Sequence, residues 1–383
     1  MFDPRRPTTC ISAILLLSLS ALTAGCASHS AMVKCSTLPI SATSEQATPA
    51  CPVPPLEYPF RNLVLQGGGV LGSAYAGALA VLDQQGIYAK IERVAGTSAG
   101  AILATLVALR FEPKDIELIV NNLDFKQFED DGSVVRLAKH FGYFKGDFAL
   151  GLFRCLITKK LGLPPGSKVT FADLHRGGYR DLHIFSTDIS TKSSVEFSNE
   201  KTPDFEVAMA VRMSISIPLF FAAVDQNKQV FVDGGVLRNY AIDLFDSAQG
   251  VNPATLGLSL QNVHAKPVAQ PVKDLPEYIK AVFSTLLDVQ DIALGNNLPD
   301  LERTVIIDDL GISFTDFGLD LQQKQALVAA GAQCTCDYLE DWQKWNASGH
   351  LPSSMVRANE GKVTLNGVGR CGLVLPPAAV LEP

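Results

Sequence analysis

The sequence predicts an α/β fold built on a central, mostly parallel β-sheet, and two segments carry this prediction. Apolar runs at Asn62 to Leu65 and at Ile91 to Ala95 each lead through a glycine-containing turn into a run with helical spacing. Strands that alternate with helices in this way form right-handed parallel units, which place both turns at the carboxyl edge of one sheet. With 47% hydrophobic residues, the 383-residue chain can bury a large core.

The remaining elements follow from the same periodicities. After the helix that ends at Leu109, the patterns predict helices at 113–120, 205–213, 278–294 and 322–345, and strands at 182–187, 195–198, 229–232 and 304–307. The stretch from Phe125 to Leu163 is rich in aromatic residues with basic residues between them. We expect it to form a helical cap region packed on the sheet, and contact with acyl chains or a membrane surface is the alternative.

The N-terminus has the features of an export signal. Arg5 and Arg6 precede an apolar stretch, Ile11 to Leu22, that is too short to span a membrane comfortably, so residues 1–25 are predicted to be a signal peptide. The segment that ends at Cys26 resembles a bacterial lipobox, although Thr23 stands where leucine is usual. Lipidation of Cys26 is therefore predicted, with an ordinary cleaved signal peptide as the alternative. Because alanine rather than aspartate follows Cys26, we expect a cell-envelope lipoprotein at the outer membrane, facing the periplasm or the surface.

Composition divides the rest of the chain into three parts. Residues 26–58 are rich in Ser, Thr, Ala and Pro and are predicted to be a lipid-anchored flexible tether. Residues 59–345 are predicted to be the catalytic domain, with its core motifs in 63–245. Residues 346–383 are rich in Gly, Pro and Ser and are predicted to be a loose C-terminal extension.

Charge and cysteine content limit the function classes. A formal net charge of -7 without a long basic run argues against nucleic acid as the main partner. Export permits disulfides, and the possible pairs are Cys35 with Cys51, and Cys371 with Cys334 or Cys336; buried unpaired thiols are the alternative. No histidine pair accompanies the last two cysteines, so no zinc site is predicted.

The turn GTSAG at residues 96–100 is predicted to be a nucleophile elbow that presents Ser98. Such a turn bends so sharply from strand to helix that bulky neighbours would collide, and the neighbours here are glycine, alanine and threonine. The following helix directs its unpaired amides and the positive end of its dipole toward the space beside Ser98, where an oxyanion would develop. The pattern also arises by chance in loops rich in alanine and glycine, so it needs support from other segments.

The sequence GGGVLG at residues 67–72 follows the first strand and has two possible uses. It fits the dinucleotide fingerprint GxGxxG, for which Glu92 is the candidate acidic residue. That interpretation leaves Ser98 without a role, and an exported protein meets little NAD. We therefore favour the second use, in which successive glycine amides form a concave nest that binds an oxyanion.

Three ordered motifs together resemble those of the patatin-like phospholipase family. They are GGGVLG at 67–72, GTSAG at 96–100 and DGG at 233–235, and weaker likenesses follow at 169–174, at 210–218 and at Asn239. The resemblance covers about residues 60 to 245 and continues more loosely to Trp345. It implies a patatin-like three-layer α/β/α fold with a central mostly parallel sheet and a helical cap region.

The resemblance also implies a mechanism, which is a serine and aspartate dyad without histidine. In it, Ser98 is the nucleophile, Asp233 takes its proton and later activates water, and the amides of Gly67, Gly68 and Gly69 bind the oxyanion. Five further glycines support the motifs: Gly72, Gly96, Gly100, Gly234 and Gly235. The implied substrates are phospholipids or other lipid esters, without a metal or cofactor. Since some members of the family depend on a partner, a protein activator is left open.

Two positions depart from the family pattern. Leu71 stands where the family usually has Arg or Lys, which removes a cation beside the oxyanion or an anionic head group, and Ala241 stands where proline is common.

Two other functions are also open. A histidine-dependent α/β-hydrolase would need the chain order Ser, Asp, His, which His264 satisfies. A noncatalytic envelope protein that uses the fold as a lipid-binding or scaffold module is the second alternative.

Overall fold

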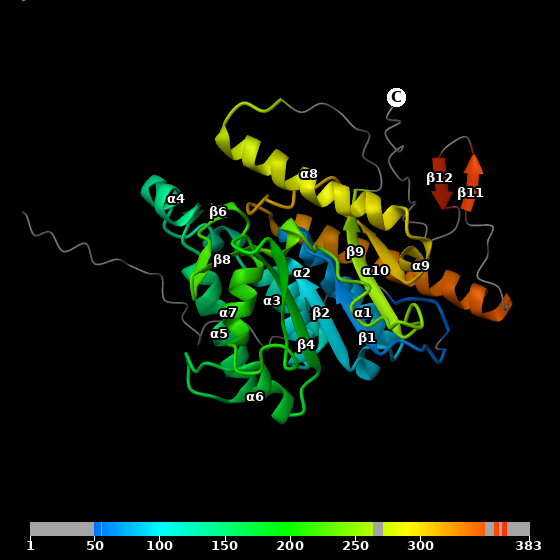
Figure 1. Ribbon diagram of the computed structural model, residues 1–383. Helices are drawn as coiled ribbons and strands as arrows, with labels where there is room; N and C mark the ends of the chain where they lie inside the picture. The colour runs from blue at the N-terminus through cyan, green and yellow to red at the C-terminus, as the bar shows by residue number, and fades with distance from the viewer. Residues whose placement is uncertain (1–49, 55, 263–270, 349–355, 360–361, 366–383) are drawn as a thin grey trace, which may run out of the picture.

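The computed structural model describes residues 50–54, 56–262, 271–348, 356–359 and 362–365 (Figure 1). Five strands of its central sheet are parallel and lie in the order β10-β9-β1-β2-β4. Next to β4 the sheet continues with the antiparallel strands β8 and β7, and β5 pairs with β4 as well. The strands are β1 (Asn62–Leu65), β2 (Arg93–Thr97), β4 (Asp181–Asp188), β5 (Ser193–Phe197), β7 (Val224–Gln226), β8 (Gln229–Asp233), β9 (Thr255–Gln261) and β10 (Thr304–Asp308). The predicted α/β fold is confirmed, with a sheet that is parallel at its centre and antiparallel at one side.

Alternating side chains of the parallel strands divide the core between the two faces of the sheet. Leu63, Leu65 and Val94 belong to the large core beneath the helices, whereas Val64 and Ala95 face a smaller cluster formed with the segment 240–245. Helix α8 lies across the carboxyl edge of the strands (Figure 1). The helices are α1 (Ala74–Gln84), α2 (Ala99–Ala108), α3 (Pro113–Asn122), α4 (Val134–His140), α5 (Asp147–Leu161), α6 (Phe171–Arg176), α7 (Val207–Ser214), α8 (Leu275–Gly295), α9 (Leu298–Glu302) and α10 (Leu321–Ser348).

Strand β9 is the main element that the sequence did not predict. It pairs with both β1 and β10, so it is a central strand of the sheet. Its leucines alternate, but Gly257 and Ser259 lie between them, and a glycine in a strand interior weakens the local signal. The structure explains the glycine, because a Cβ at Gly257 would overlap the hydroxyl of Tyr240.

The predicted cap region contains α4, strand β3 (Gly142–Phe144) and α5. Strand β3 pairs with β6 (Leu219–Phe221), so the cap is joined to the segment between α7 and β8. Side chains of α5 such as Leu152 and Leu156 are part of the large core, which agrees with the expected packing on the sheet. Helix α4, in contrast, buries none of its side chains.

The folded part begins earlier than the sequence indicated, which corrects the boundary placed at residue 58. Val53 is buried, and Cys51 forms a disulfide with Cys336 of α10. The predicted pairing of Cys51 with Cys35 is therefore wrong, and so is that of Cys336 with Cys371. Cys155 and Cys334 are also disulfide-bonded. The bridge closes a separation of 285 residues, which no local pattern in the sequence reveals.

The C-terminal part also differs from the expected loose extension. Helix α10 continues to Ser348, and strands β11 (Val356–Asn359) and β12 (Lys362–Leu365) form an antiparallel pair. The predicted signal peptide with Cys26, and His264, lie outside the described residues. Among the helices that are described, none combines the length and apolar character needed to cross a membrane.

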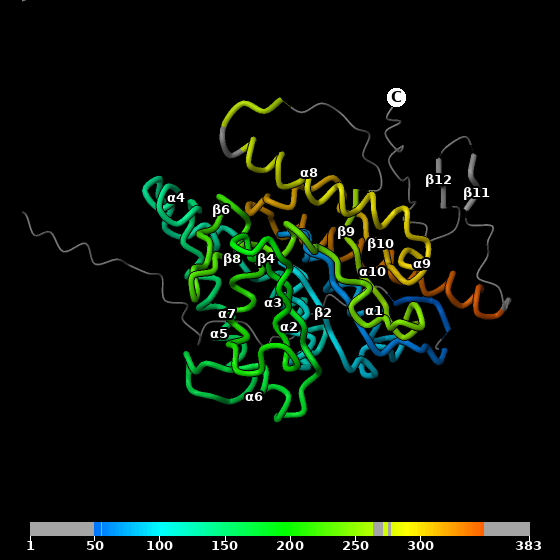
Figure 2. Tube along the Cα trace, in the orientation of Figure 1, coloured from blue at the N-terminus to red at the C-terminus, as the bar shows by residue number. Residues whose placement is uncertain are grey.

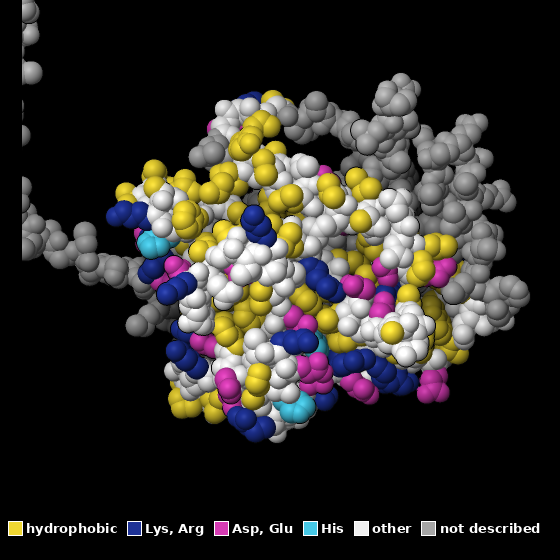
Figure 3. Space-filling model, in the orientation of Figure 1, with side chains coloured by type: hydrophobic (Ala, Val, Ile, Leu, Met, Phe, Trp, Pro, Cys, Tyr) yellow, Lys and Arg dark blue, Asp and Glu magenta, His cyan; other side chains and the backbone are white. Residues whose placement is uncertain are grey.

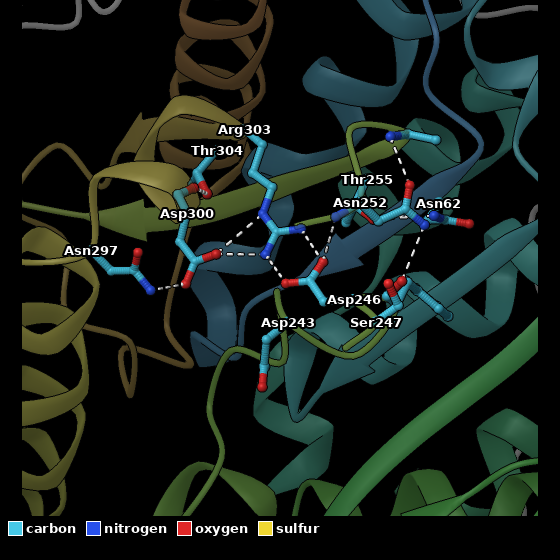
Figure 4. A network of polar contacts seen from close by, with 12 residues as sticks. Asn62, Asp243, Asp246, Ser247, Asn252, Thr255, Asn297, Asp300, Arg303 and Thr304 are labelled. Carbon is cyan, nitrogen blue, oxygen red and sulfur yellow. Dashed lines mark hydrogen bonds and ion pairs between the residues drawn. The ribbon is translucent and has the colours of Figure 1, made fainter. Parts of the chain in front are cut away.

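A buried polar network fixes the segment that follows the DGG motif (Figure 4). The guanidinium of Arg303 donates to both carboxylate oxygens of Asp246, each at 2.6 Å, and also to Asp300. Asp246 in turn accepts the Asn252 amide. This bidentate pair joins the segment between β8 and β9 to the start of β10. It therefore fixes the position of the chain that follows the DGG motif.

Helices α1 and α10 cross at two glycines. A Cβ at Gly331 would overlap the carbonyl oxygen of Ala74, and one at Gly77 would overlap that of Val328. Replacing glycine by alanine inside a helix normally stabilises it by about 1 kcal/mol. Here we expect Gly331→Ala to lower the free energy of unfolding by about 1–3 kcal/mol, because two backbones must separate.

Chemical denaturation of the purified variant measures this effect. Gly318→Ala is the matched control, because the nearest atoms to its Cβ, at 3.3 and 3.6 Å, belong to the side chains of Asp316 and Lys126. A Gly331→Ala variant as stable as the control would show that the two helices do not need this close approach.

Candidate active site

Ser98 lies between β2 and α2 in a backbone conformation that side chains rarely adopt. Its φ is 52° and its ψ is -123°, which is the strained geometry of a nucleophile elbow. Two glycines make the turn possible, because a Cβ at Gly96 would overlap the Gly100 carbonyl, and one at Gly100 would overlap the Leu65 carbonyl. The Ser98 amide donates to Ser214 Oγ at 2.9 Å, which holds the elbow against α7.

Asp233 ends β8 and reaches Ser98 across β4. Strand β4 lies between β2 and β8, so the chain after Asp233 must pass close over it. Gly234 allows this passage, since a Cβ there would overlap the Phe185 carbonyl and come within 2.7 Å of Thr97 Cγ2. The result is a hydrogen bond of 2.7 Å from Ser98 Oγ to Asp233 Oδ2.

The environment of Asp233 suits it to accept a proton. The carboxylate is fully buried, and burial raises its pKa from 3.8 to about 7, although hydrogen bonds from the Gly235 amide and Ser98 lower it in part. The second oxygen, Oδ1, accepts the Gly235 amide at 2.7 Å, which fixes the orientation of the carboxylate. A buried, oriented carboxylate whose pKa lies near neutral pH is an effective general base.

The glycine-rich loop lies beside Ser98, and one of its three predicted oxyanion donors, the Gly67 amide, is corrected. The Gly67 amide already donates to the Asn239 carbonyl oxygen at 3.1 Å, so it is not free to bind an oxyanion. Two side chains lie close to Gly67, because a Cβ there would overlap Asn239 Oδ1 and lie 3.1 Å from Ser98 Cβ. Gly68 and Gly69 remain the candidate donors.

The path of this loop requires glycine at its third position. Gly69 has φ +54°, and a Cβ there would overlap the carbonyl oxygen of Phe314. The Val70 amide donates to the same oxygen at 3.0 Å. At the end of the loop, Gly72 brings the chain against Ala99, 3.0 Å from the added Cβ. Leu71 is buried in the core, so the position that carries a cation in the resemblance is apolar here.

Asn239 joins the glycine-rich loop to the segment that follows the DGG motif, a role that the sequence motif did not reveal. Its side-chain amide donates to the Gly67 carbonyl at 3.1 Å, while its main-chain carbonyl accepts the Gly67 amide. Its main-chain amide donates to Gln290 Oε1 of α8 at 2.7 Å. Gln290 also donates to the Gly235 carbonyl at 2.8 Å, so α8 is bound directly to the loop that carries Asp233.

Helix α8 is bound to the glycine-rich loop as well. Gln66, the residue before the glycines, donates to Asp291 at 2.5 Å and accepts from Ser259 Oγ and the Leu260 amide. Burial raises the pKa of Asp291 to about 7, while the bond from Gln66 lowers it in part. Sequence reasoning missed Gln66, Gln290 and Asp291, because their partners are far away along the chain.

An apolar pocket extends from Ser98 between the helices. Its walls come from α2 (Ile102, Leu103, Leu106), α3 (Ile119, Val120) and α5 (Leu152, Phe153, Leu156), and Phe221 and Phe317 contribute further rings. Apart from Ser73 and Ser98, the side chains that line it are hydrophobic. A hydrocarbon chain attached to a carbonyl at Ser98 would fit this chemistry, whereas a charged group would not.

Comparisons with known proteins identify relatives of this chain. A sequence model of the family described as "Patatin-like phospholipase" matches residues 63–246, which contain all three motifs. The uncharacterized protein YqhO of Bacillus subtilis is 32% identical over 301 residues, which is 73% of this chain and 98% of YqhO. A protein of Invertebrate iridescent virus 6, called "Probable lipid hydrolase 463L", is 26% identical over 48% of this chain and 63% of its own length.

Among solved structures, VipD from Legionella pneumophila is similar to this chain. The match has a TM-score of 0.47 and 17% identity, and it covers 72% of this chain and 66% of VipD. The extent and identity of the match to YqhO, together with the family match, establish the class. The chain belongs to the patatin-like phospholipase family, whose name indicates hydrolysis of lipid esters.

Proposed function

We propose that this protein is an exported lipid acyl hydrolase that uses Ser98 as nucleophile and Asp233 as base. The observation that carries the proposal is the 2.7 Å hydrogen bond between Ser98 Oγ and Asp233 Oδ2 beside an apolar pocket. The pocket supports a fatty acyl ester, such as a phospholipid or lysophospholipid, as the substrate class. No step needs a group beyond those of the chain, the substrate and water.

The reaction proceeds in two displacements at the acyl carbon. Ser98 Oγ attacks the ester carbonyl while Asp233 takes the hydroxyl proton, and the amides of Gly68 and Gly69 stabilise the oxyanion. The tetrahedral intermediate collapses, the alcohol leaves with the proton from Asp233, and the acyl group remains on Ser98. Asp233 then takes a proton from water, whose oxygen attacks the acyl ester. The second tetrahedral intermediate collapses, Ser98 Oγ leaves with the proton from Asp233, and the fatty acid is released.

The proposed location is the cell envelope, with Cys26 as the lipidated N-terminus at the outer membrane. The disulfide between Cys51 and Cys336 supports export, because such bonds persist in oxidising compartments. Loss of palmitate labelling in a Cys26→Ala variant tests the anchor. A cleaved chain that carries no lipid would favour an ordinary signal peptide.

Covalent capture tests the proposed function directly. An alkyl fluorophosphonate reacts with an activated serine, so we expect one adduct, located on the peptide that contains Ser98, and complete loss of hydrolysis of phospholipid and soluble esters. The His264→Ala variant should be captured and inhibited like the wild type. Loss of activity in that variant would favour a histidine-dependent esterase, and an unlabelled wild type inactive on all esters would favour a noncatalytic module.

A further inference from the structure

The tip formed by α4 and β3, residues 133–145, exposes apolar side chains to solvent. Val134 is 73% exposed, Val135 is 64% exposed and Phe141 is 52% exposed. A helix of a globular protein normally buries one apolar stripe against the core, but α4 buries none of its side chains. Exposed apolar residues that are adjacent in this way mark an interaction surface.

The same tip carries basic side chains on a protein whose net charge is -7. Arg136 and Lys145 form ion pairs with the flanking Asp131 and Asp147, whereas Lys139 and His140 at the end of α4 are exposed. The space-filling view shows dark blue side chains next to yellow ones around this region (Figure 3). Apolar residues flanked by Lys and Arg are the composition that binds an anionic membrane surface.

The base of the tip is rigid, so its exposure is a built feature of the fold. Arg212 is buried and donates to the carbonyl oxygens of Lys145, at 2.7 Å, and Ala222, at 2.9 Å. Asp130 accepts the amides of Gly146 and Phe148 at 2.5 and 2.7 Å. These bonds hold the C-terminal end of β3 and the start of α5 in place.

A continuous series of aromatic rings connects the tip to the pocket. The ring of Tyr143, which is exposed, lies 5.0 Å from that of Phe144, and Phe144 lies 4.9 Å from Phe220. Phe220 stacks on Phe317 at 5.2 Å, and both Phe317 and Phe221 line the pocket beside Ser98. An apolar chain that enters at the tip therefore meets apolar surface as far as the pocket.

Helix α8 extends the exposed apolar surface on the same side of the molecule. It contacts β6, which pairs with β3, and Figure 2 shows α4 and α8 both on the upper side. Tyr278, Val282 and Val289 follow one another at helical spacing and are all exposed. Gln290 and Asp291 on the inner side of α8 bond to Asn239 and Gln66, so the exposed face is the outer side of the same helix.

We propose that the tip and the exposed face of α8 form a docking surface for an anionic lipid bilayer, into which Val134, Val135 and Phe141 insert. The part of the proposal in which the rings lead an acyl chain to Ser98 rests on the proposed function. Exposed apolar side chains with Lys139 and His140 beside them have the composition that favours an anionic bilayer as the occupant.

Fluorescence of a single introduced tryptophan tests the docking surface in the full chain. The background is Ser98→Ala, so that vesicle lipid is not consumed. Val135→Trp places the probe in the tip, and Leu163→Trp is the matched control. Leu163 is also exposed but follows the far end of α5, whose 15 residues span about 22 Å. Phosphatidylglycerol vesicles with brominated acyl chains are compared with brominated phosphatidylcholine vesicles, and the emission of Trp342 and Trp345 is subtracted with the parent protein.

We expect quenching and a blue shift at position 135 and not at position 163, with phosphatidylglycerol vesicles at least about tenfold more effective than phosphatidylcholine vesicles. Because the probe reports location, an N-terminal anchor that holds the protein on vesicles does not produce this pattern. Equal quenching at the two positions, or none at 135 in vesicle-bound protein, would overturn the proposal. Shielding of position 135 from acrylamide without vesicles, together with a dimeric mass, would assign the surface to a second copy.

A kinetic comparison separates this proposal from the proposed function. In the otherwise wild-type chain, Val134→Asp with Val135→Asp should reduce hydrolysis of vesicle phospholipid at least about tenfold more than hydrolysis of a soluble short-chain ester. Equal reduction of both rates would overturn the docking role. If the wild type hydrolyses neither substrate, the proposed function fails, and the tryptophan quenching alone decides whether the surface binds a bilayer.

Discussion

The Ser98→Ala variant is expected to lose at least about 10⁴-fold in kcat for ester hydrolysis, because the substitution removes the proposed nucleophile. The fold should persist, since the main-chain contacts of the elbow, including the bond from the Ser98 amide to Ser214, do not use the hydroxyl. Steady-state kinetics with a phospholipid and with a soluble ester measure the loss, and thermal unfolding measures the stability.

Ser198→Ala is the matched control for this prediction. Ser198 is also buried, but its hydroxyl accepts the main-chain amide of Lys201, and it follows β5 at a different part of the sheet. We expect this variant to keep the wild-type kcat within a few-fold. A Ser98→Ala enzyme with more than about a hundredth of the wild-type kcat would show that another nucleophile acts.

Replacing Asp233 by asparagine is expected to lower kcat about 10²- to 10⁴-fold, which is the range for loss of a general base. The wild-type enzyme should show kcat/KM that rises with pH and reaches a plateau above pH about 7, because Asp233 can accept a proton only when it is ionised. The variant should lack this rise. A pH profile that is identical in both proteins would assign the base to another group.

The same substitution has an opposite effect on stability. The pKa of Asp233 is raised in the folded state, so its contribution to stability is fully present below pH 3.8 and is lost as the pH rises through about 7. The difference corresponds to at most about 4 kcal/mol. Asp233→Asn should therefore be more stable than the wild type at pH 8 and no more stable at pH 4, which denaturation at the two values would measure. Higher stability with lower activity is the behaviour of a residue kept for function.

The sequence allowed prediction of those parts of the site that are encoded in short segments. The elbow at Ser98 and the turn at Asp233 depend on glycines within two residues of each, so motif and geometry agree. The role of Gly67 was not predictable in the same way. Whether its amide is free depends on the carbonyl of Asn239, which is 172 residues away along the chain.

The parts that sequence reasoning missed are all determined by tertiary contacts. Strand β9 carries a glycine whose reason is the hydroxyl of Tyr240, and that contact exists only in the folded sheet. The contacts of α8 with Gln66 and Asn239 join segments that are 225 and 51 residues apart. The periodicity of α8 indicated a helix, but it did not indicate which loops the helix would hold.

The bridge between Cys51 and Cys336 has a consequence for the order of folding. During synthesis Cys51 emerges long before its partner, because 285 residues separate the two cysteines. The strands from β1 to β10 can pair before the bridge exists, and Cys51 must wait as a thiol or a temporary mixed disulfide until α10 arrives. The disulfide that joins the first described residues to α10 therefore forms late. Its presence indicates that the whole domain has been synthesised and folded.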